Sequence, residues 1–473
     1  MNRQPNGKRP FASKGTPRRP SAPRESTGLS TGARRLALEV LTDVHRNGAY
    51  ASLALGERLR NARLSPADRR LATGIVYGAL ENELAIDWAL DRLMNHPTRE
   101  PVQRDILRLS AYQILFLDRV PDSAAVNEAV NLVKAMGMTQ AAGFVNATLR
   151  NLSRGKADIP WPKREDGLRE FLSVRGSMPL WLVDRLIQAY GEAEAERVVL
   201  YREPEPWLVL RPNMTRMSDA EFEALLSSRP WQVERGAVAH AWRVRGAADI
   251  ALDEAYRKGL FSVQGQSSML AAEALDVKPG MKVLDACAAP GGKAAYLCER
   301  MQLTGRVFAW ELHEKRAHLL ESMRRRLGLD NLRVTVRDAS VYRPDLDRSL
   351  DAILLDAPCS GTGVMAQKPD LKLRLKPEDV TAMAQTQAQL LETLCHYLRV
   401  GGALVYSTCS LLPEENAGQV EVFLSRHPEY VMDALPQGVP ESLRNRQTDF
   451  GLQILPGQEG LEGFFIAKMR RVR

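Results

Sequence analysis

From about residue 259 onward, short apolar strands alternate with amphipathic helices, and this alternation restricts the possible folds more than any other feature of the sequence. The predicted strands are residues 282–286, 306–311, 333–336, 351–355 and 403–407, and the predicted helices are 290–300, 313–327 and 377–398. Repeated strand–helix–strand units form a mostly parallel sheet with right-handed crossovers and helices on both faces. The sequence therefore predicts an α/β domain over residues 259–473.

The N-terminal third of the chain has a different character. Residues 1–31 carry seven basic residues and one acid among prolines and small polar residues, which predicts a disordered basic arm. Apolar residues then recur at helical spacing through residues 32–154, beginning with a face of Leu36, Val40 and Leu41. We predict a small all-α domain over residues 32–154.

The segment between these two parts, residues 155–258, mixes both patterns. Residues 207–211 and 241–245 are typical of strands, and Ser218 followed by Glu221 forms a capping box at the start of a helix. This predicts a small α+β middle module. Three of its arginines could contact RNA or could simply lie exposed on strands: Arg211, Arg243 and Arg245.

Composition narrows the class of protein. The 473 residues contain five cysteines and no CxxC pair, so neither a disulfide framework nor a metal site is indicated. The sequence contains no secretory signal pattern and no run of about 18 apolar residues, which predicts a cytoplasmic chain outside the membrane. The formal net charge of +8 resides mostly in the basic arm, which suits non-specific contacts with phosphates.

The first strand–helix turn of the α/β domain, Asp285–Lys293, reads DACAAPGGK. Gly291 and Gly292 allow a ligand to approach the backbone, and the helix that follows offers free N–H groups. The turn is neither a dinucleotide fingerprint nor a phosphate-binding loop. Glu311 closes the second strand, where a carboxylate can bind ribose hydroxyls, and Asp338 follows the third strand, near an adenine amine. These features predict S-adenosylmethionine as the cofactor.

Two cysteines, Cys359 and Cys409, follow predicted strands and are each followed by serine. Loops at the carboxyl ends of parallel strands form the ligand crevice, so a thiol there is placed for chemistry. Methylation at C5 of cytosine needs such a thiol, because a thiolate that adds to C6 makes C5 nucleophilic. Asp356, in a partly buried loop, could hold a proton near N3 of the base. Chain physics alone leaves open which cysteine attacks.

The other three cysteines have simpler interpretations. Cys298 and Cys395 lie in predicted helices and are expected to be buried as small hydrophobic residues. Cys287 lies in the predicted cofactor turn, where its backbone is expected to matter more than its sulfur.

Several motifs together resemble one enzyme family. The C-terminal domain resembles the RNA 5-methylcytosine methyltransferase family, the Nop/Sun group, in CAAPGGK at 287–293, DAPCSGTG at 356–363, KPD at 368–370 and STCSLLPEEN at 407–416. The all-α domain resembles the RNA-binding domain of the NusB antitermination-factor family in VNEAVNLVKAMG at 126–137 and FVNATLRNL at 144–152.

The resemblance implies a Rossmann-like S-adenosylmethionine-dependent methyltransferase domain in which Cys409 is the nucleophile and Cys359 assists product release. It also implies the cofactor contacts: Cys287, Ala288, Ala289, Pro290, Gly291, Gly292, Lys293, Glu311, Asp338 and Asp356. The expected substrate is a cytosine of small-subunit (16S) rRNA, and a monomer is expected. Two alternatives are a tRNA cytosine-C5 methyltransferase and a non-catalytic RNA-binding or assembly factor.

Overall fold

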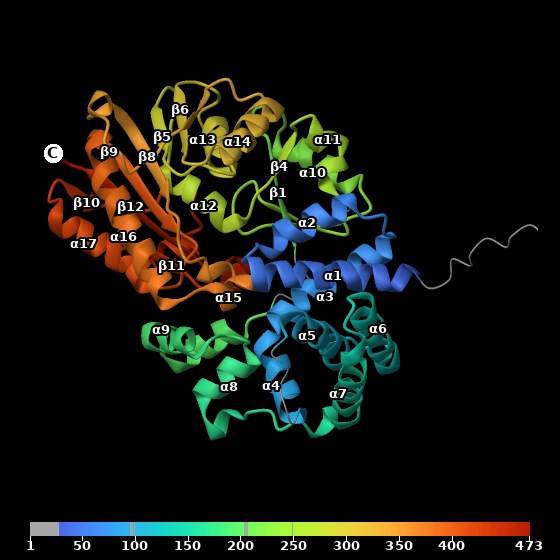
Figure 1. The fold of residues 1–473 in the computed structure, drawn as a ribbon. Coiled ribbons are helices and arrows are strands. Elements are labelled where there is room, and N and C mark those ends of the chain that lie inside the picture. Colours follow the sequence, from blue (N-terminus) through green and yellow to red (C-terminus); the bar gives the residue numbers. More distant parts are fainter. Residues whose placement is uncertain (1–27, 95–97, 99, 203–206, 248) are drawn as a thin grey trace, which may run out of the picture.

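The computed structural model describes residues 28–94, 98, 100–202, 207–247 and 249–473 (Figure 1). Residues 1–27 of the predicted arm lie outside the described residues, and the first helix begins at Gly28, before the predicted boundary at residue 31. Within the described ranges, no helix combines the length and the apolar character that a membrane crossing requires.

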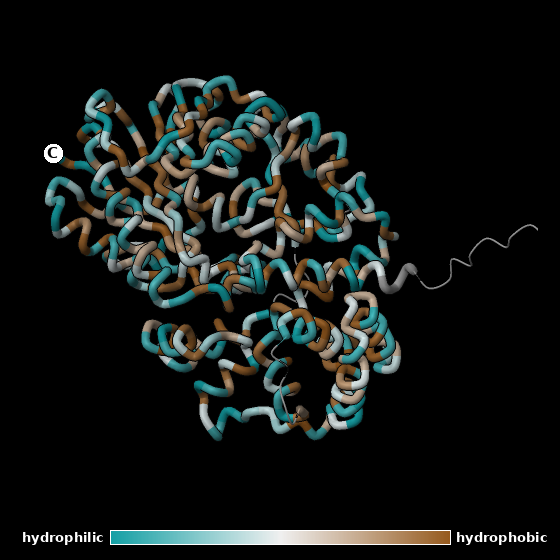
Figure 2. Tube along the Cα trace, in the orientation of Figure 1, coloured by the Kyte–Doolittle hydropathy of each residue, from teal (hydrophilic) through white to brown (hydrophobic). Residues whose placement is uncertain are grey.

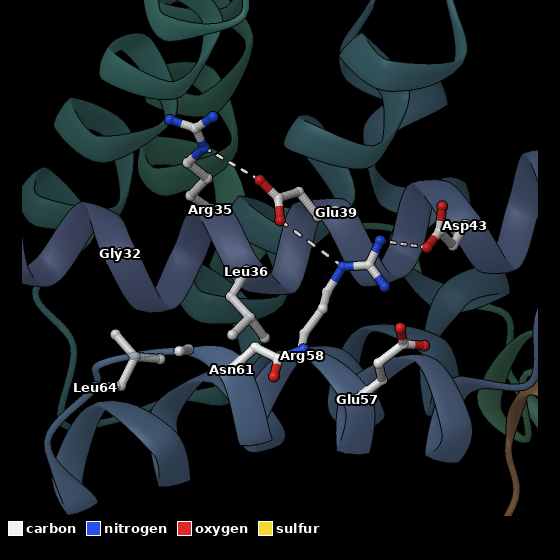
Figure 3. Close-up of a pocket in the computed structure, with 10 residues that line it drawn as sticks. Gly32, Arg35, Leu36, Glu39, Asp43, Glu57, Arg58, Asn61 and Leu64 are labelled. Carbon is white, nitrogen blue, oxygen red and sulfur yellow. Dashed lines mark hydrogen bonds and ion pairs between the residues drawn. The ribbon is translucent and has the colours of Figure 1, made fainter.

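The N-terminal part is all helical, as predicted. Its helices are α1 (Gly28–Asn47), α2 (Ala51–Asn61), α3 (Pro66–Glu81), α4 (Glu83–Leu93), α5 (Pro101–Phe116), α6 (Asp122–Ala135) and α7 (Ala142–Gly155). The predicted face of Leu36, Val40 and Leu41 is buried in their common core. The hydropathy of these helices alternates along the chain (Figure 2), as expected for helices that bury one face. Figure 1 shows α1 running between helices α4 to α7, which lie below it, and the strands of the other two parts of the chain, which lie above it.

Among its described residues, the middle segment contains four α-helices and a small antiparallel sheet. Its elements are α8 (Leu168–Arg175), α9 (Leu180–Leu200), β1 (Leu208–Pro212), α10 (Asp219–Ser227), β2 (Gln232–Arg235), β3 (Trp242–Arg245), α11 (Glu254–Arg257) and β4 (Phe261–Val263). The strand order is β2-β3-β1-β4. The predicted capping box is present, because the Ser218 hydroxyl and the Glu221 carboxylate each bind the other's backbone N–H.

The three arginines considered as possible RNA contacts have partners within the protein. Arg211 is fully buried and its guanidinium pairs with the carboxylate of Glu299 in the α/β domain, with Nη2 3.0 Å from Oε1. Arg243 is ion-paired with Glu234 at 2.8 Å, and the Arg245 guanidinium lies 4.0 Å from the ring centre of Trp207. Arg211 therefore joins the middle module to the α/β domain.

The C-terminal part is the predicted α/β domain. Its strands are β5 (Lys282–Asp285), β6 (Arg306–Glu311), β7 (Leu332–Val336), β8 (Leu350–Asp356), β9 (Leu398–Thr408), β10 (Tyr430–Met432), β11 (Leu452–Ile454) and β12 (Phe464–Arg471). Its helices are α12 (Gln266–Leu275), α13 (Gly292–Arg300), α14 (Glu314–Leu327), α15 (Asp370–Arg374), α16 (Pro377–Leu394), α17 (Ala417–Arg426) and α18 (Glu441–Arg444).

The sheet is parallel at its centre and antiparallel at one side. Its order is β10-β12-β9-β8-β5-β6-β7, with β11 paired to β12. Strands β5 to β9 run parallel, and β12 runs antiparallel to β9. The helix predicted over 377–398 ends at Leu394, because a 3-10 turn at Cys395–Tyr397 and then β9 follow. Cys395, Tyr397 and Leu398 are buried and continue the apolar pattern of the helix, so hydrophobicity alone does not mark this change of structure.

The short helix α15 joins the α/β domain to the rest of the protein. The Asp370 carboxylate accepts the backbone N–H of Ala51 at 3.4 Å, at the start of α2. The Lys372 ammonium donates to the carbonyl of Gly176 at 3.1 Å, just after α8. The loop that carries Cys359 therefore continues into a helix that rests on both N-terminal parts.

Candidate active site

Two thiols meet at the carboxyl end of the parallel strands. Cys359 follows β8 and Cys409 follows β9, and these neighbouring strands pair in the register Asp356↔Ser407. The Cys359 and Cys409 sulfur atoms lie 3.2 Å apart, and both cysteines are half-buried and free. The structure therefore brings together the two cysteines that the sequence singled out, at hydrogen-bond distance and without a disulfide.

The two thiols differ in acidity. The hydrogen bond from Cys359 lowers the pKa of Cys409 below its ordinary value, although burial and the charge of Asp356 act in the opposite direction. The ammonium groups of Lys368 and Lys293 lower this pKa further. The hydrogen bond to Cys409, followed by burial, raises the pKa of Cys359 well above its ordinary value. These opposite shifts favour the thiolate on Cys409, with Cys359 as the hydrogen-bond donor to it.

Asp356 lies beside this pair, at the end of β8. Its Oδ2 is 2.8 Å from the ammonium of Lys293, and its Oδ1 accepts the hydroxyl of Ser407 at 2.9 Å. Asp356 is partly buried, as the sequence predicts, and it forms an ion pair with Lys293 that the sequence did not reveal.

The turn Cys287–Lys293 connects β5 to α13 and lines a cavity of about 620 Å³, within the usual size range of ligand pockets. Gly291 has φ 113°, and a Cβ at this position would lie 2.4 Å from the side chain of Met323. Glycine is therefore required for the path of the turn. Burial raises the pKa of the Cys287 thiol, so this cysteine is not a third nucleophile in the cluster.

Glu311 and Asp338 lie at the same edge of the sheet, after β6 and β7. Glu311 is buried, accepts the backbone N–H of His313 at 2.9 Å and lies 3.5 Å from the Arg316 guanidinium. Asp338 is exposed and accepts the backbone N–H of Ser340 at 2.9 Å. The row of carboxylates predicted from the sequence is present, although neither side chain lines the cavity formed by the turn.

One residue that the sequence analysis assigned no role is Asp285, the last residue of β5. It is 1% exposed, lines the cavity, and neither carboxylate oxygen has a hydrogen-bond partner among the described residues. Burial, followed by the charge of Asp356, raises the pKa of Asp285 to about 7. The backbone N–H groups of Cys287 and Ala294 act in the opposite direction but do not reach it with hydrogen-bond geometry. A buried carboxyl without a partner calls for a donor from a ligand.

The two remaining cysteines are buried, as expected. Cys298 lies in α13 and Cys395 in the 3-10 turn after α16, and both side chains are almost fully covered. Burial raises the pKa of both thiols, which suits a packing role.

Comparison with known proteins places this site in a family. The model of the 16S rRNA methyltransferase RsmB/F family matches residues 272–470, and the model of the NusB family matches residues 31–154. The probable ribosomal RNA small subunit methyltransferase B of Bacillus subtilis (strain 168) is 37% identical over 445 residues, which cover 93% of this chain and 99% of that protein. The chain belongs to the 16S rRNA methyltransferase RsmB/F family. Ribosomal RNA small subunit methyltransferase B of Proteus mirabilis (strain HI4320) is 30% identical, with 93% and 99% coverage.

Solved structures share the fold of this chain. The structure of PH0851 has a TM-score of 0.79 and 24% identity and covers 94% of this chain and 99% of its own, which shows a shared fold across all three parts. A methyltransferase homolog protein from Pyrococcus horikoshii has a TM-score of 0.55 and 29% identity and covers 64% of this chain and 98% of its own. The predicted family, the NusB-like domain and the S-adenosylmethionine-dependent methyltransferase class are confirmed.

Proposed function

We propose that this methyltransferase of rRNA modifies C5 of a cytosine in 16S rRNA through a covalent bond between Cys409 and C6. The observation that carries the proposal is the contact between two thiols of unequal acidity beside the cofactor turn. A methyltransferase that acts on an oxygen or an exocyclic amine has no need of a thiolate, whereas C5 of cytosine must first be activated by a nucleophile.

The residues around the cavity fit S-adenosylmethionine. The turn from Cys287 to Lys293 would lie along the cofactor in this cavity. Glu311 and Asp338, which lie at the ends of the neighbouring strands but do not line the cavity, would bind the ribose hydroxyls and the adenine amine of a cofactor that extends toward them. The buried carboxyl of Asp285 would accept a hydrogen bond from the methionine ammonium, the donor that this carboxyl lacks. S-adenosylmethionine supplies the methyl group that C5 takes.

The chain's own residues account for the remaining chemistry. The Cys409 thiolate forms a bond to C6, the electron pair of the C5–C6 double bond moves to C5, and the Asp356–Lys293 pair shares a proton with N3. After methylation, a base takes the C5 proton, the electron pair of the C5–H bond restores the C5–C6 double bond, and the C6–sulfur bond breaks with its electron pair left on the Cys409 sulfur. N3 returns its proton to the Asp356–Lys293 pair. Cys359, 3.2 Å from Cys409, acts at this release step by donating a hydrogen bond to the departing thiolate.

The substrate is proposed from the relatives and from the architecture. The Bacillus subtilis and Proteus mirabilis relatives are named as methyltransferases of small-subunit ribosomal RNA. Because C5 of cytosine is stacked in a helix, the target is expected in a loop or in a flipped-out position. The NusB-like domain, the middle module and the basic arm would hold the RNA mainly through phosphate contacts.

The test is a covalent trap. The Cys359→Ala variant, incubated with S-adenosylmethionine and total RNA, is expected to give a protein–RNA band on a denaturing gel, and sequencing the linked RNA names the substrate nucleotide. The band should vanish in the Cys359→Ala, Cys409→Ala double variant and should be absent in the buried-thiol control Cys395→Ala. If the linked RNA is tRNA instead of 16S rRNA, the substrate is tRNA. If Cys409→Ala methylates RNA as well as the wild type does, the covalent mechanism is refuted.

A further inference from the structure

A buried glutamate holds the loops of both cysteines. Glu415 is fully buried at the end of a short 3-10 helix, Pro413–Glu415, just before α17. Its Oε1 accepts the backbone N–H of Ser360 at 2.8 Å and the side-chain amide of Gln387 at 3.1 Å. Its Oε2 accepts the hydroxyl groups of Ser360 and Ser410. A single carboxylate thus binds the residue that follows each cysteine.

The setting of this carboxylate is unusual for a structural acid. No Lys, Arg or His side chain among the described residues is ion-paired with Glu415, and all four of its donors are neutral. A buried carboxylate without a counter-ion is costly, and hydrophobic packing or an ion pair would hold two loops together at lower cost. Packing alone therefore does not explain a carboxyl group at this position, between the two cysteine loops.

We propose that Glu415 is a positioning residue for the reaction, which holds Cys359 and Cys409 in hydrogen-bond contact and keeps the proton on Cys359, so that Cys409 is the thiol that ionises. This inference rests on the proposed function, because it explains how two similar cysteines take different roles. Glu415 acts through the serines and through its charge, and it touches neither sulfur.

The charges around the thiols support this asymmetry. The charges of Glu415, Asp356, Lys293 and Lys368 act on the pair. The hydrogen bond to Cys409 and burial are the main causes of the raised pKa of Cys359, and the charge of Glu415 acts in the same direction. The two lysines act instead on Cys409 and lower its pKa. The charge of Glu415 therefore raises the pKa of Cys359, whereas the charges of the two lysines lower the pKa of Cys409.

The loops also bind each other around the same point. The backbone N–H of Gly363 donates to the carbonyl of Cys409 at 2.8 Å, and the Thr362 hydroxyl accepts the N–H of Leu411 at 2.7 Å. These contacts keep the loops adjacent when the charge of Glu415 is removed. A substitution that removes only that charge should therefore change the chemistry of the thiols more than the fold.

The test is Glu415→Gln, which keeps the shape and loses the charge. Iodoacetamide alkylation of the full-length protein, without RNA or cofactor, is followed for each cysteine by mass spectrometry across pH. In the wild type, Cys409 should react much faster than Cys359. In Glu415→Gln the ratio of the Cys409 alkylation rate to the Cys359 alkylation rate should fall about tenfold. Single-turnover methylation should fall about tenfold or more, while the affinities for cofactor and RNA stay at wild-type values.

The matched control is Glu414→Gln, at the preceding position, whose carboxylate binds Arg185 and neither cysteine loop. It should leave both alkylation rates and methylation unchanged. A wild-type alkylation preference in Glu415→Gln would overturn the proposal. If that variant does not fold, Ser360→Ala and Ser410→Ala each remove one donor to the same carboxylate and should narrow the preference in the same way, and unchanged preferences in both would also overturn it.

The alkylation readout separates this inference from the proposed function. A wild-type protein that methylates no cytosine but still shows the Glu415-dependent preference would refute the function and leave the positioning role standing. If the wild-type protein methylates cytosine but Glu415→Gln keeps the wild-type preference for alkylation of Cys409, the proposed function would stand and the positioning role would be refuted.

Discussion

A charged cluster in the NusB-like domain makes its stability depend on pH. The His45 side chain of α1 binds two buried carboxylates, with Nε2 2.9 Å from Glu83 of α4 and Nδ1 2.7 Å from Asp105 of α5. Arg108 lies 2.9 Å from the same glutamate. Burial alone would lower the pKa of His45, but the hydrogen bonds to Asp105 and Glu83 outweigh it and raise this pKa to about 9. The imidazolium thus links three helices.

The raised pKa fixes the sign and the size of the effect. The ordinary pKa of this histidine is 6.5, so below pH 6.5 both the folded and the unfolded chain carry the proton and the full stabilisation is present. The stabilisation is lost as the pH rises from 6.5 through about 9. Each pKa unit corresponds to ~1.36 kcal/mol, so the pH-dependent part of the free energy of unfolding is about 3 kcal/mol.

The variant that tests this is His45→Gln, with the exposed His318→Gln as its control. Hydrogen exchange of the α1, α4 and α5 amides, compared with the wild type at the same pH, reports the local free energy of opening. The loss caused by His45→Gln should be about 3 kcal/mol larger at pH 6 than at pH 10, and the control should show no such difference. A loss of the same size at both pH values would refute the assigned charge on His45.

Three further outcomes are expected. Glu311→Ala should weaken S-adenosylmethionine binding in calorimetry while RNA affinity is retained, and unchanged cofactor affinity would reject its contact with the ribose. Arg211→Met leaves the buried carboxylate of Glu299 unpaired, so the free energy of unfolding in urea denaturation should fall by about 3–5 kcal/mol. A fall of less than about 1 kcal/mol would contradict a structural role for this ion pair. Gly291→Ala should weaken cofactor binding, because the φ of 113° at this position strains any L side chain, and wild-type affinity would show that the turn can move.

Local sequence patterns predicted the elements that carry their own signal. The second strand of the sheet, Arg306–Glu311, has the predicted bounds, because its apolar core lies between Gly305 and the polar start of α14. The antiparallel strand β12 inserts beside β9 from the far end of the chain, and no local pattern reveals such a neighbour. The same limit explains why Arg211 was taken as a possible RNA contact, since its partner Glu299 lies 88 residues away.

The candidate site shows the same division. The cofactor turn and both cysteines have local signals, namely a glycine pair and thiols after apolar strands. Asp285 and Glu415 have none, because their roles depend on complete burial and on partners from other elements. A carboxylate at the end of a strand or in a PEEN segment is usually solvated. Only the three-dimensional structure shows that Asp285 and Glu415 are buried instead.

The unequal roles of the thiols follow from strand pairing rather than from the cysteine motifs themselves. Each motif alone offers a thiol after a strand and a serine behind it, so the two are nearly equivalent in sequence. The register Asp356↔Ser407 brings the sulfurs together, and a slip of one residue would turn every side chain to the other face of the sheet. Once they are in contact, the ammonium of Lys293, from the helix after β5, acts on Cys409, and the buried carboxylate before α17 acts on Cys359. The difference in acidity between the two thiols is therefore a property of the assembled sheet and not of either motif alone.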